Sequence, residues 1–207
     1  MPLYYREIYK DITIIILGDI WLEGDKRKKK VALVANCLLN QNSKVNGFAF
    51  FPDMLWELVE LLHKYEYGIL QLPCPETVYA GLRRWWYVRE QYDNAKFREI
   101  SRNAIAPILD QVEALLKDGC KVVLIGVDGS PSCGIRSSGS DPRWGGKPEI
   151  EKGNYPQTKK SGIFMEVLKK EIRERGLPSL KEIGAGLDMP DFDKSKISKE
   201  IGEFLRD

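Results

Sequence analysis

Three short apolar runs alternate with longer segments of helical periodicity, and this alternation limits the folds that the chain can adopt. The runs cover residues 31–35, 68–72 and 121–127, and each is bounded by polar or turn residues. Short continuous apolar runs are typical of strands that are buried on both faces of a parallel sheet. Because strands that alternate with helices form right-handed βαβ units, helices are expected to cover both faces. We therefore predict a single α/β domain with a doubly wound, mostly parallel sheet.

Three further segments have apolar residues at helical spacing. They cover residues 53–65, 94–119 and 161–176. Asp53 is the expected N-cap of the first helix, and Pro107 is expected either to kink the second or to start its second half. Residues 177–183 are expected to add a last short strand.

The first 30 residues do not fit this repeat of strands and helices. Residues 12–17 are interpreted as an added, β-rich edge strand, and residues 25–30 as a charged linker. The predicted organisation is an N-terminal extension, 1–30, followed by an α/β domain, 31–207. A chain of 207 residues is long enough to form one continuous hydrophobic core.

The composition argues against several classes of protein. The chain has 32 basic and 30 acidic residues, and its net charge of +2 is too close to neutral for a broad polyanion-binding surface. No apolar run approaches the roughly 18 residues of a membrane helix, and Glu7 and Asp11 precede the first short isoleucine run, unlike a signal peptide. We expect a cytoplasmic protein that does not bind membranes and whose four cysteines stay reduced.

Three of these cysteines occupy equivalent places relative to the predicted strands. Cys37 lies just past the first strand, Cys74 just past the second, and Cys133 a few residues past the third. Ligands of open α/β sheets bind outside the carboxyl ends of the strands, and neighbouring strands are only about 4.8 Å apart. The three thiols are therefore expected to share one site. Cys120 precedes the third strand, roughly 20 Å from Cys133, and is interpreted as a structural thiol.

The positions of the three cysteines leave the nature of the site open. Three thiolates and a water can hold zinc, although the chain has no Cys-x-x-Cys pair of the kind usual in zinc sites. Iron–sulfur clusters also prefer thiolate ligands. Cysteines that merely pack well near strand ends are the third reading.

Three motifs together resemble the thiouracil desulfidase family. They are residues 36–43 (NCLLNQNS), 72–76 (LPCPE) and 129–134 (GSPSCG), and the resemblance extends over residues 31–183. Proteins similar to this bind a [4Fe-4S] cluster through three cysteines, leave one iron without a protein ligand, and remove sulfur from a thiolated base. The chain departs from the thiouracil enzymes after Cys37, where their Gly and Arg-Tyr-Asp-Gly pattern is missing, and over residues 79–86.

The resemblance implies roles for individual residues. Cys37, Cys74 and Cys133 are the implied cluster ligands. Ser130 is the candidate active-site hydroxyl. Glu76 is the best available carboxylate for moving the proton of an attacking water, and Ser132 and Asn36 are further candidates for contacts with the substrate. The expected chemistry is non-redox, because an open iron is a Lewis acid that binds the sulfur of a C=S group while water attacks the carbon.

Two segments near the second and third cysteines carry further expectations. Residues 83–89 interleave arginines with aromatic rings, a composition that could stack a base and hold a phosphate. We favour the plainer reading, in which the rings pack on the sheet and the arginines stay in solvent. Residues 128–157 lack periodicity and are expected to form either a lid, with Trp144 shielding the site, or a disordered insertion.

The single histidine, His63, falls off the apolar stripe of its helix and is expected to be solvated. This weighs against Ser-His and Cys-His hydrolase chemistry, which needs a histidine beside the nucleophile. The leading hypothesis is a cluster-dependent desulfidase for a thiolated nucleobase or similar small thioamide. The alternatives are an RNA-directed or carrier-linked sulfur-transfer protein, in which nucleic acid is a partner, and a protein with zinc or another structural metal.

Overall fold

A four-stranded parallel sheet carries the fold in the computed structural model, which describes residues 25–145 and 156–206. From one edge to the other, the strands are β2 (Gly68–Gln71), β1 (Lys30–Val34), β3 (Lys121–Val127) and β6 (Lys181–Ala185). Every neighbouring pair is parallel. The predicted α/β class with a mostly parallel sheet is therefore confirmed.

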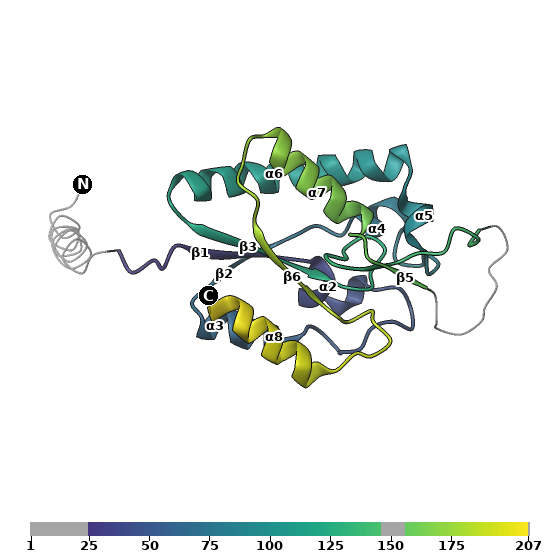
Figure 1. The fold of residues 1–207 in the computed structure, drawn as a ribbon, viewed down its shortest axis with the longest axis horizontal. Coiled ribbons are helices and arrows are strands. Elements are labelled where there is room, and N and C mark those ends of the chain that lie inside the picture. Colours follow the sequence, from purple (N-terminus) through teal and green to yellow (C-terminus); the bar gives the residue numbers. More distant parts are fainter. Residues whose placement is uncertain (1–24, 146–155, 207) are drawn as a thin grey trace, which may run out of the picture.

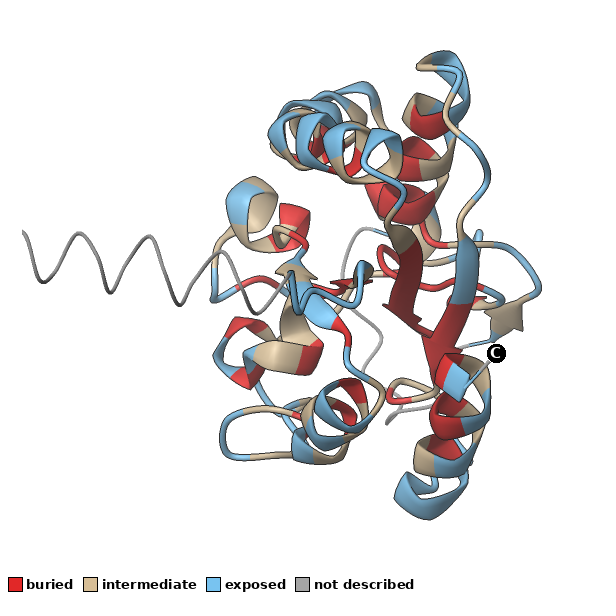
Figure 2. Ribbon diagram, turned by 90° about the vertical axis from the view of Figure 1, so that its left-hand side faces the viewer, coloured by how far each residue is buried: buried red, intermediate tan, exposed pale blue. Residues whose placement is uncertain are grey.

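Two layers of helices enclose this sheet (Figure 1). One face is covered by α6 (Ala95–Lys117) and α7 (Ile163–Glu174), and the other by α3 (Trp56–Lys64) and α8 (Lys194–Arg206). Figure 2 shows that the buried residues of the long helices face the sheet and that their outer sides are exposed. The prediction of helices on both faces is confirmed.

The hydrophobic core is centred on the two middle strands. In β3, every residue from Val122 to Val127 is buried, and in β1 the last three residues are buried. The strand β2 differs, because it lies at the edge of the sheet and Ile69 is 43% exposed. The prediction of a fully buried strand over residues 68–72 was wrong in this respect, although Leu72 at its end is buried.

The helix ends follow local chemistry in some places and tertiary contacts in others. The helix α6 begins where the predicted segment 94–119 begins, and Asn94 caps it by accepting a hydrogen bond from the Phe97 N–H at 2.9 Å. Asp53 is not the N-cap of α3; that place is taken by Leu55, which is buried and donates its N–H to Leu38 O. Pro107 lies inside one continuous helix and does not start a second one.

Two features at the end of the chain differ from the sequence-based expectation. The last strand is β6, four residues later at its start than the predicted strand at 177–183. The helix α8 was not predicted, although Ile197, Ile201 and Leu205 recur every four residues and are buried.

Short elements complete the described part of the chain. They are α2 (Asn36–Leu39), the 3₁₀ helix η1 (Gln41–Ser43), α4 (Pro75–Ala80), α5 (Arg89–Tyr92), β4 (Ser138–Gly139) and β5 (Gln157–Thr158). The strand predicted at residues 12–17 lies outside the described residues. Among the helices of the described part, none is long and apolar enough to cross a membrane.

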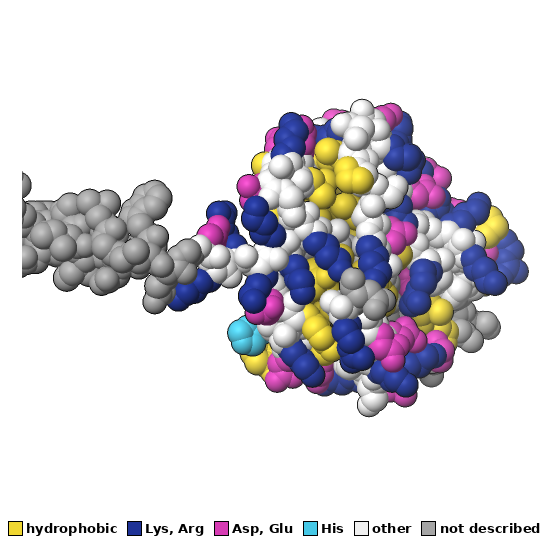
Figure 3. Space-filling model, turned by 60° about the vertical axis from the view of Figure 1, so that its left-hand side comes forward, with side chains coloured by type: hydrophobic (Ala, Val, Ile, Leu, Met, Phe, Trp, Pro, Cys, Tyr) yellow, Lys and Arg dark blue, Asp and Glu magenta, His cyan; other side chains and the backbone are white. Residues whose placement is uncertain are grey.

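The face that carries the amino ends of the strands is mixed in charge. Figure 3 shows many Lys and Arg side chains there, with Asp and Glu side chains and hydrophobic groups among them. His63 is exposed on α3, as predicted, and is visible in cyan on this view. The cysteines that the sequence singled out follow the opposite, carboxyl ends of the strands.

Candidate functional site

The carboxyl edge of the sheet positions the three cysteine loops beside one another. Beyond the strands, Ala35 donates its N–H to Ile125 O at 2.9 Å, and Leu72 donates its N–H to Val34 O at 2.8 Å. These bonds hold the chain in register up to the sheet edge, where the first two loops depart. Cys37 then lies in α2, Cys74 is the N-cap residue of α4, and Cys133 lies in the turn that follows β3.

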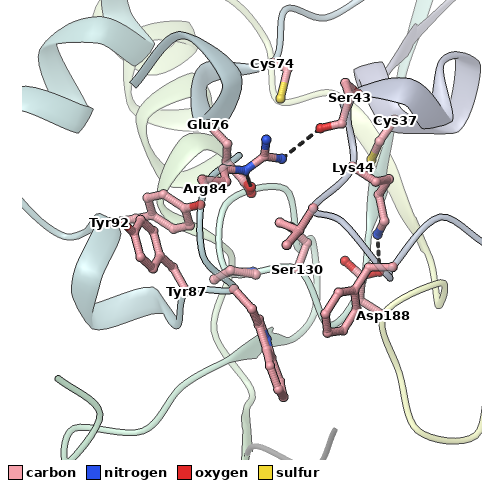
Figure 4. Close-up of a pocket in the computed structure, with 14 residues that line it drawn as sticks. Cys37, Ser43, Lys44, Cys74, Glu76, Arg84, Tyr87, Tyr92, Ser130 and Asp188 are labelled. Carbon is pink, nitrogen blue, oxygen red and sulfur yellow. Dashed lines mark hydrogen bonds and ion pairs between the residues drawn. The ribbon is translucent and has the colours of Figure 1, made fainter. Parts of the chain in front are cut away.

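Two of the thiols line a common pocket, and the third lies next to it. Cys37 and Cys74 line this pocket (Figure 4). Cys133 is 7% exposed and does not line it. The pKa of the Cys133 thiol is raised by burial and, to a smaller extent, by the charges of Cys37, Glu76 and Cys74. The three cysteines and the glutamate therefore form one electrostatically connected group.

Burial favours the protonated form of these thiols. It raises the pKa of Cys37 to about 12, and the positive charge of Lys44 opposes this rise. Burial also raises the pKa of Cys74, where Arg84 opposes the rise. Metal ligation requires thiolates, and the positive charges of Lys44 and Arg84 lie where they would stabilise those thiolates.

A ready-made site for one metal ion is not present among the described residues. No three His, Cys, Asp or Glu side chains in residues 25–145 and 156–206 are grouped closely enough to bind one ion. All four cysteines of the chain are free thiols. The ligands of an iron–sulfur cluster bind different iron atoms, so they can be spaced more widely than the ligands of a single ion.

A buried network of hydrogen bonds holds Glu76 beside the pocket. Ser132 donates its hydroxyl to Glu76 Oε1, and Arg84 donates Nε–H to Glu76 Oε2 at 2.8 Å. The same guanidinium donates to Ser43 O at 2.8 Å and to Gly81 O at 3.1 Å. Arg84 thus ties the loop after β1 to the loop after β2.

The burial of Arg84 corrects one expectation. The arginines of residues 83–89 were expected to stay in solvent, but the side chain of Arg84 is only 3% exposed. Arg89 also has partners, since it donates to Ser161 O and to Glu166 Oε1. Buried cations need such partners to offset the loss of hydration.

Ser130 lines the pocket from the turn after β3. Its hydroxyl oxygen accepts the Cys133 N–H at 3.1 Å and lies 3.4 Å from Ser132 Oγ, which can accept its proton because the Ser132 hydroxyl donates to Glu76. Gly129 precedes it with φ of +91°, and a Cβ there would come within 2.4 Å of the backbone of Asp188. Glycine therefore allows the loop after β6 to pack directly on the Ser130 turn.

The other two predicted contact residues do not reach the pocket lining. Ser132 acts through Glu76, to which it donates a hydrogen bond. Asn36 lies outside the pocket, donates to Ser43 Oγ at 2.6 Å and accepts from Gln71 Nε2 at 2.6 Å. Its amide connects the loop after β1 to the end of β2, which is a structural contact.

The sequence reasoning missed a buried ion pair in this pocket. Lys44 donates to Asp188 Oδ1, and the two side chains are 8% and 14% exposed. Both residues line the pocket, and Figure 4 shows them facing each other beside Cys37. One signal could have revealed Asp188, because it follows the fourth parallel strand at the same edge as the cysteines.

Aromatic side chains form one wall of the pocket. Phe48, Trp86 and Tyr87 line it, and the ring centroids of Phe48 and Trp86 are 5.1 Å apart. Trp144 lies 5.5 Å from Trp86 on the same measure. This contact brings Trp144, in the segment predicted to form a lid, to the pocket wall. Residues 146–155 of that segment lie outside the described part. Trp85, by contrast, is 64% exposed.

The pocket is small. Its volume is about 50 Å³, and since roughly 10–15 Å³ holds one water molecule, it has room for only a few waters. A six-membered ring can enter only if the surrounding side chains or loops move apart.

Comparisons with known proteins identify relatives of this chain. A family model described as putative 2-thiouracil desulfurase matches residues 29–174. An uncharacterized protein of Methanocaldococcus jannaschii is 36% identical over 153 residues, which cover 70% of this chain and 98% of that protein. No solved structure matches the chain. Cys37, Cys74 and Cys133 lie within residues 29–174, as does Lys44, whereas Asp188 lies beyond them.

Proposed function

This chain belongs to the family of putative 2-thiouracil desulfurases, and on that premise we propose that it removes sulfur from a small thiolated heterocycle with a [4Fe-4S] cluster. The observation that carries the proposal is the arrangement of Cys37, Cys74 and Cys133. They come from three successive strand-to-helix connections of one parallel sheet and interact electrostatically at one pocket.

The donor set of the site fits such a cluster. Cys37, Cys74 and Cys133 would hold it, since thiolates are the usual ligands of iron–sulfur clusters. The positive charges of Lys44 and Arg84 oppose the rises in the pKa of Cys37 and Cys74, so each favours the thiolate form of its neighbour. When bound, the cluster would supply an iron without a protein ligand, a Lewis acid with affinity for sulfur.

The residues of the chain itself would bind the substrate and move its protons. Glu76 is the proposed general base, which takes a proton from a pocket water as that water attacks the carbon of the C=S group. Arg84 and Ser132 hold its two oxygens in place. Ser130 would donate its hydroxyl proton to a polar atom of the heterocycle in exchange for its 3.4 Å contact with Ser132 Oγ.

The aromatic wall would exclude bulk water. Phe48 and Trp86 present rings to the pocket, and flat heterocycles stack on such rings. Since the pocket holds only a few waters, we expect the cysteine loops to move apart when a cluster and a substrate bind.

The contacts of residues 83–89 favour a small substrate over RNA. An electrostatic RNA surface needs exposed cations, but Arg84 is buried and Arg89 is paired with Glu166. In this segment Arg83 and Trp85 are the exposed cation and ring. A small thiolated compound is therefore a better candidate for the substrate than a macromolecule that exchanges sulfur.

The test is the release of sulfide from 2-thiouracil. Protein reconstituted with iron and sulfide in the absence of air should produce hydrosulfide and uracil in equal amounts. Cys37→Ser, Cys74→Ser and Cys133→Ser should each abolish the release, and Cys120→Ser serves as the matched control that keeps it. If protein that contains the cluster releases no sulfide from thiolated heterocycles, the proposed activity is contradicted.

A further inference from the structure

The chemistry proposed above uses the charge of Lys44 beside Cys37 but gives its buried ion pair with Asp188 no role toward the substrate. Lys44 follows η1 in the loop after β1, and Asp188 lies in the loop after β6. Their side chains are 8% and 14% exposed and line the pocket beside Cys37. Burying two charges is costly, and a pair retained at a pocket wall can offer its remaining hydrogen-bonding capacity to a ligand.

The pair has spare donors and a spare acceptor. A lysine ammonium has three N–H donors; the hydrogen bonds of the described residues use one of them, to Asp188 Oδ1, and the ammonium also lies 5.9 Å from the centroid of the Phe50 ring. Within residues 25–145 and 156–206, no protein donor bonds to the second carboxylate oxygen, Oδ2. The two side chains therefore present an adjacent donor and acceptor to the pocket.

The position of Asp188 is tightly constrained. Its N–H donates to Asp128 O at 3.3 Å, and its backbone packs where a Cβ of residue 129 would otherwise lie. A carboxylate held by its backbone in this way is preorganised, which reduces the entropy lost when a ligand binds.

An adjacent donor and acceptor match one edge of a cyclic amide. In a ring containing –NH–C(=O)–, the carbonyl oxygen accepts from an ammonium while the neighbouring N–H donates to a carboxylate. In 2-thiouracil the carbon that bears sulfur is bonded to two ring N–H groups, and one of them, N3–H, is next to the C4 carbonyl. The sulfur could therefore point toward the cysteines while this edge meets the ion pair.

We propose that Lys44 and Asp188 are the specificity-determining residues of the pocket and recognise the N3–H and C4=O edge of an uncharged thiolated lactam base. The inference rests on the proposed desulfidase function, because only that function requires the base to carry sulfur. The charges of the pocket agree with an uncharged ligand, because Lys44 is neutralised by Asp188 and Arg84 by Glu76. These two pairs leave no surplus cation for a phosphate.

The test measures binding of the oxygen analogue, so it does not depend on turnover. Uracil and 3-methyluracil, which lacks the N3–H, are titrated by calorimetry into protein isolated without air. Wild-type protein should bind 3-methyluracil about tenfold or more weakly than uracil, since a hydrogen bond to a charged group is lost. Uridine 5′-monophosphate should bind no more tightly than uracil.

Variants separate the lost hydrogen bond from the bulk of the methyl group. In Asp188→Ala, uracil should bind more weakly, and the ratio between the two ligands should fall to within about threefold. Because a single substitution leaves the other charge buried alone, Lys44→Met/Asp188→Leu is made as well and should fold while losing the discrimination. Lys169→Met is the matched control, since it removes a partly buried ion pair with Glu182 that does not line the pocket.

Three results would overturn the inference: no uracil binding by wild-type protein, equal affinity for uracil and 3-methyluracil, or a ratio unchanged by Asp188→Ala. Sulfide release from 2-thiouracil is measured on the same preparation. Sulfide release without discrimination between the two ligands would support the proposed function and contradict the lactam site. Discrimination without sulfide release would support the lactam site and contradict the proposed function.

Discussion

Arg84 is the residue on which the arrangement of the candidate site most depends. Its guanidinium bonds the Glu76 carboxylate, the Gly81 carbonyl and the Ser43 carbonyl, which belong to two different loops. Sequence reasoning identified Glu76 but not its partner, because a run of arginines and tryptophans is usually a solvated or packing surface. Only the fold shows that one arginine of this run points inward.

Arg84→Met should therefore destabilise the protein strongly. The substitution leaves the Glu76 carboxylate buried without its cation, and breaking such a pair costs roughly 3–5 kcal/mol. Urea unfolding monitored by circular dichroism measures this loss. Arg83→Met is the matched control, since Arg83 is the exposed neighbour and its loss should change the free energy of unfolding by less than about 0.5 kcal/mol. Equal effects of the two substitutions would show that the buried network contributes little.

At the scale of elements, the strands were easier to predict than the contacts between loops. The apolar runs of β1 and β3 located two central strands almost to the residue, and the helical periodicity of residues 94–119 located the start of α6. The sheet edge shared by Cys37, Cys74 and Cys133 followed from the same reasoning. In contrast, the start of α3 depends on the tertiary bond from Leu55 to Leu38, which local sequence cannot indicate.

The loop after β6 illustrates the same limit within the site. It brings Asp188 onto the Ser130 turn across a close approach that only Gly129 permits. The family match ends at residue 174, so the resemblance gave no information about this loop. Its role depends on β6 being parallel to β3, because the loop then leaves the sheet at the same edge as the cysteine loops.

Gly129→Ala should disrupt this contact between elements. The added Cβ would come within 2.4 Å of the Asp188 backbone, in addition to the strain of a positive φ. Gly176→Ala is the control, because Gly176 has φ of +69° and nothing within 4 Å of an added Cβ. The control should cost about 1 kcal/mol and Gly129→Ala roughly 1–3 kcal/mol more, measured by thermal unfolding. If both cost the same, the close packing of the two loops would be contradicted.

At the scale of the whole molecule, the chemistry is concentrated at one edge of a rigid sheet. The four parallel strands and two helical layers bury the core, and the cysteines, Glu76 and Asp188 all follow carboxyl ends of strands. A ligand held jointly by three loops would stabilise that edge without contacting the opposite one. The free energy of such binding adds to the stability of the native state.

Cluster assembly should therefore change the local stability of the two sheet edges unequally. Hydrogen–deuterium exchange, compared between metal-free and reconstituted protein, should slow in residues 36–44, 74–84 and 129–135. Exchange should be nearly unchanged in residues 117–121, at the amino end of β3, which provide the internal control. Uniform protection of both edges would indicate a general effect on folding instead of a shared site.

The central claim is that the thiols of Cys37, Cys74 and Cys133 jointly hold one iron–sulfur cluster. The most direct measurement is the iron, zinc and acid-labile sulfide content of protein purified without air, for the wild type and for Cys37→Ser. We expect about four irons and four sulfides per wild-type chain, and loss of both from the variant while the protein remains folded. Stoichiometric zinc without sulfide, or iron and sulfide that persist in Cys37→Ser, would contradict it.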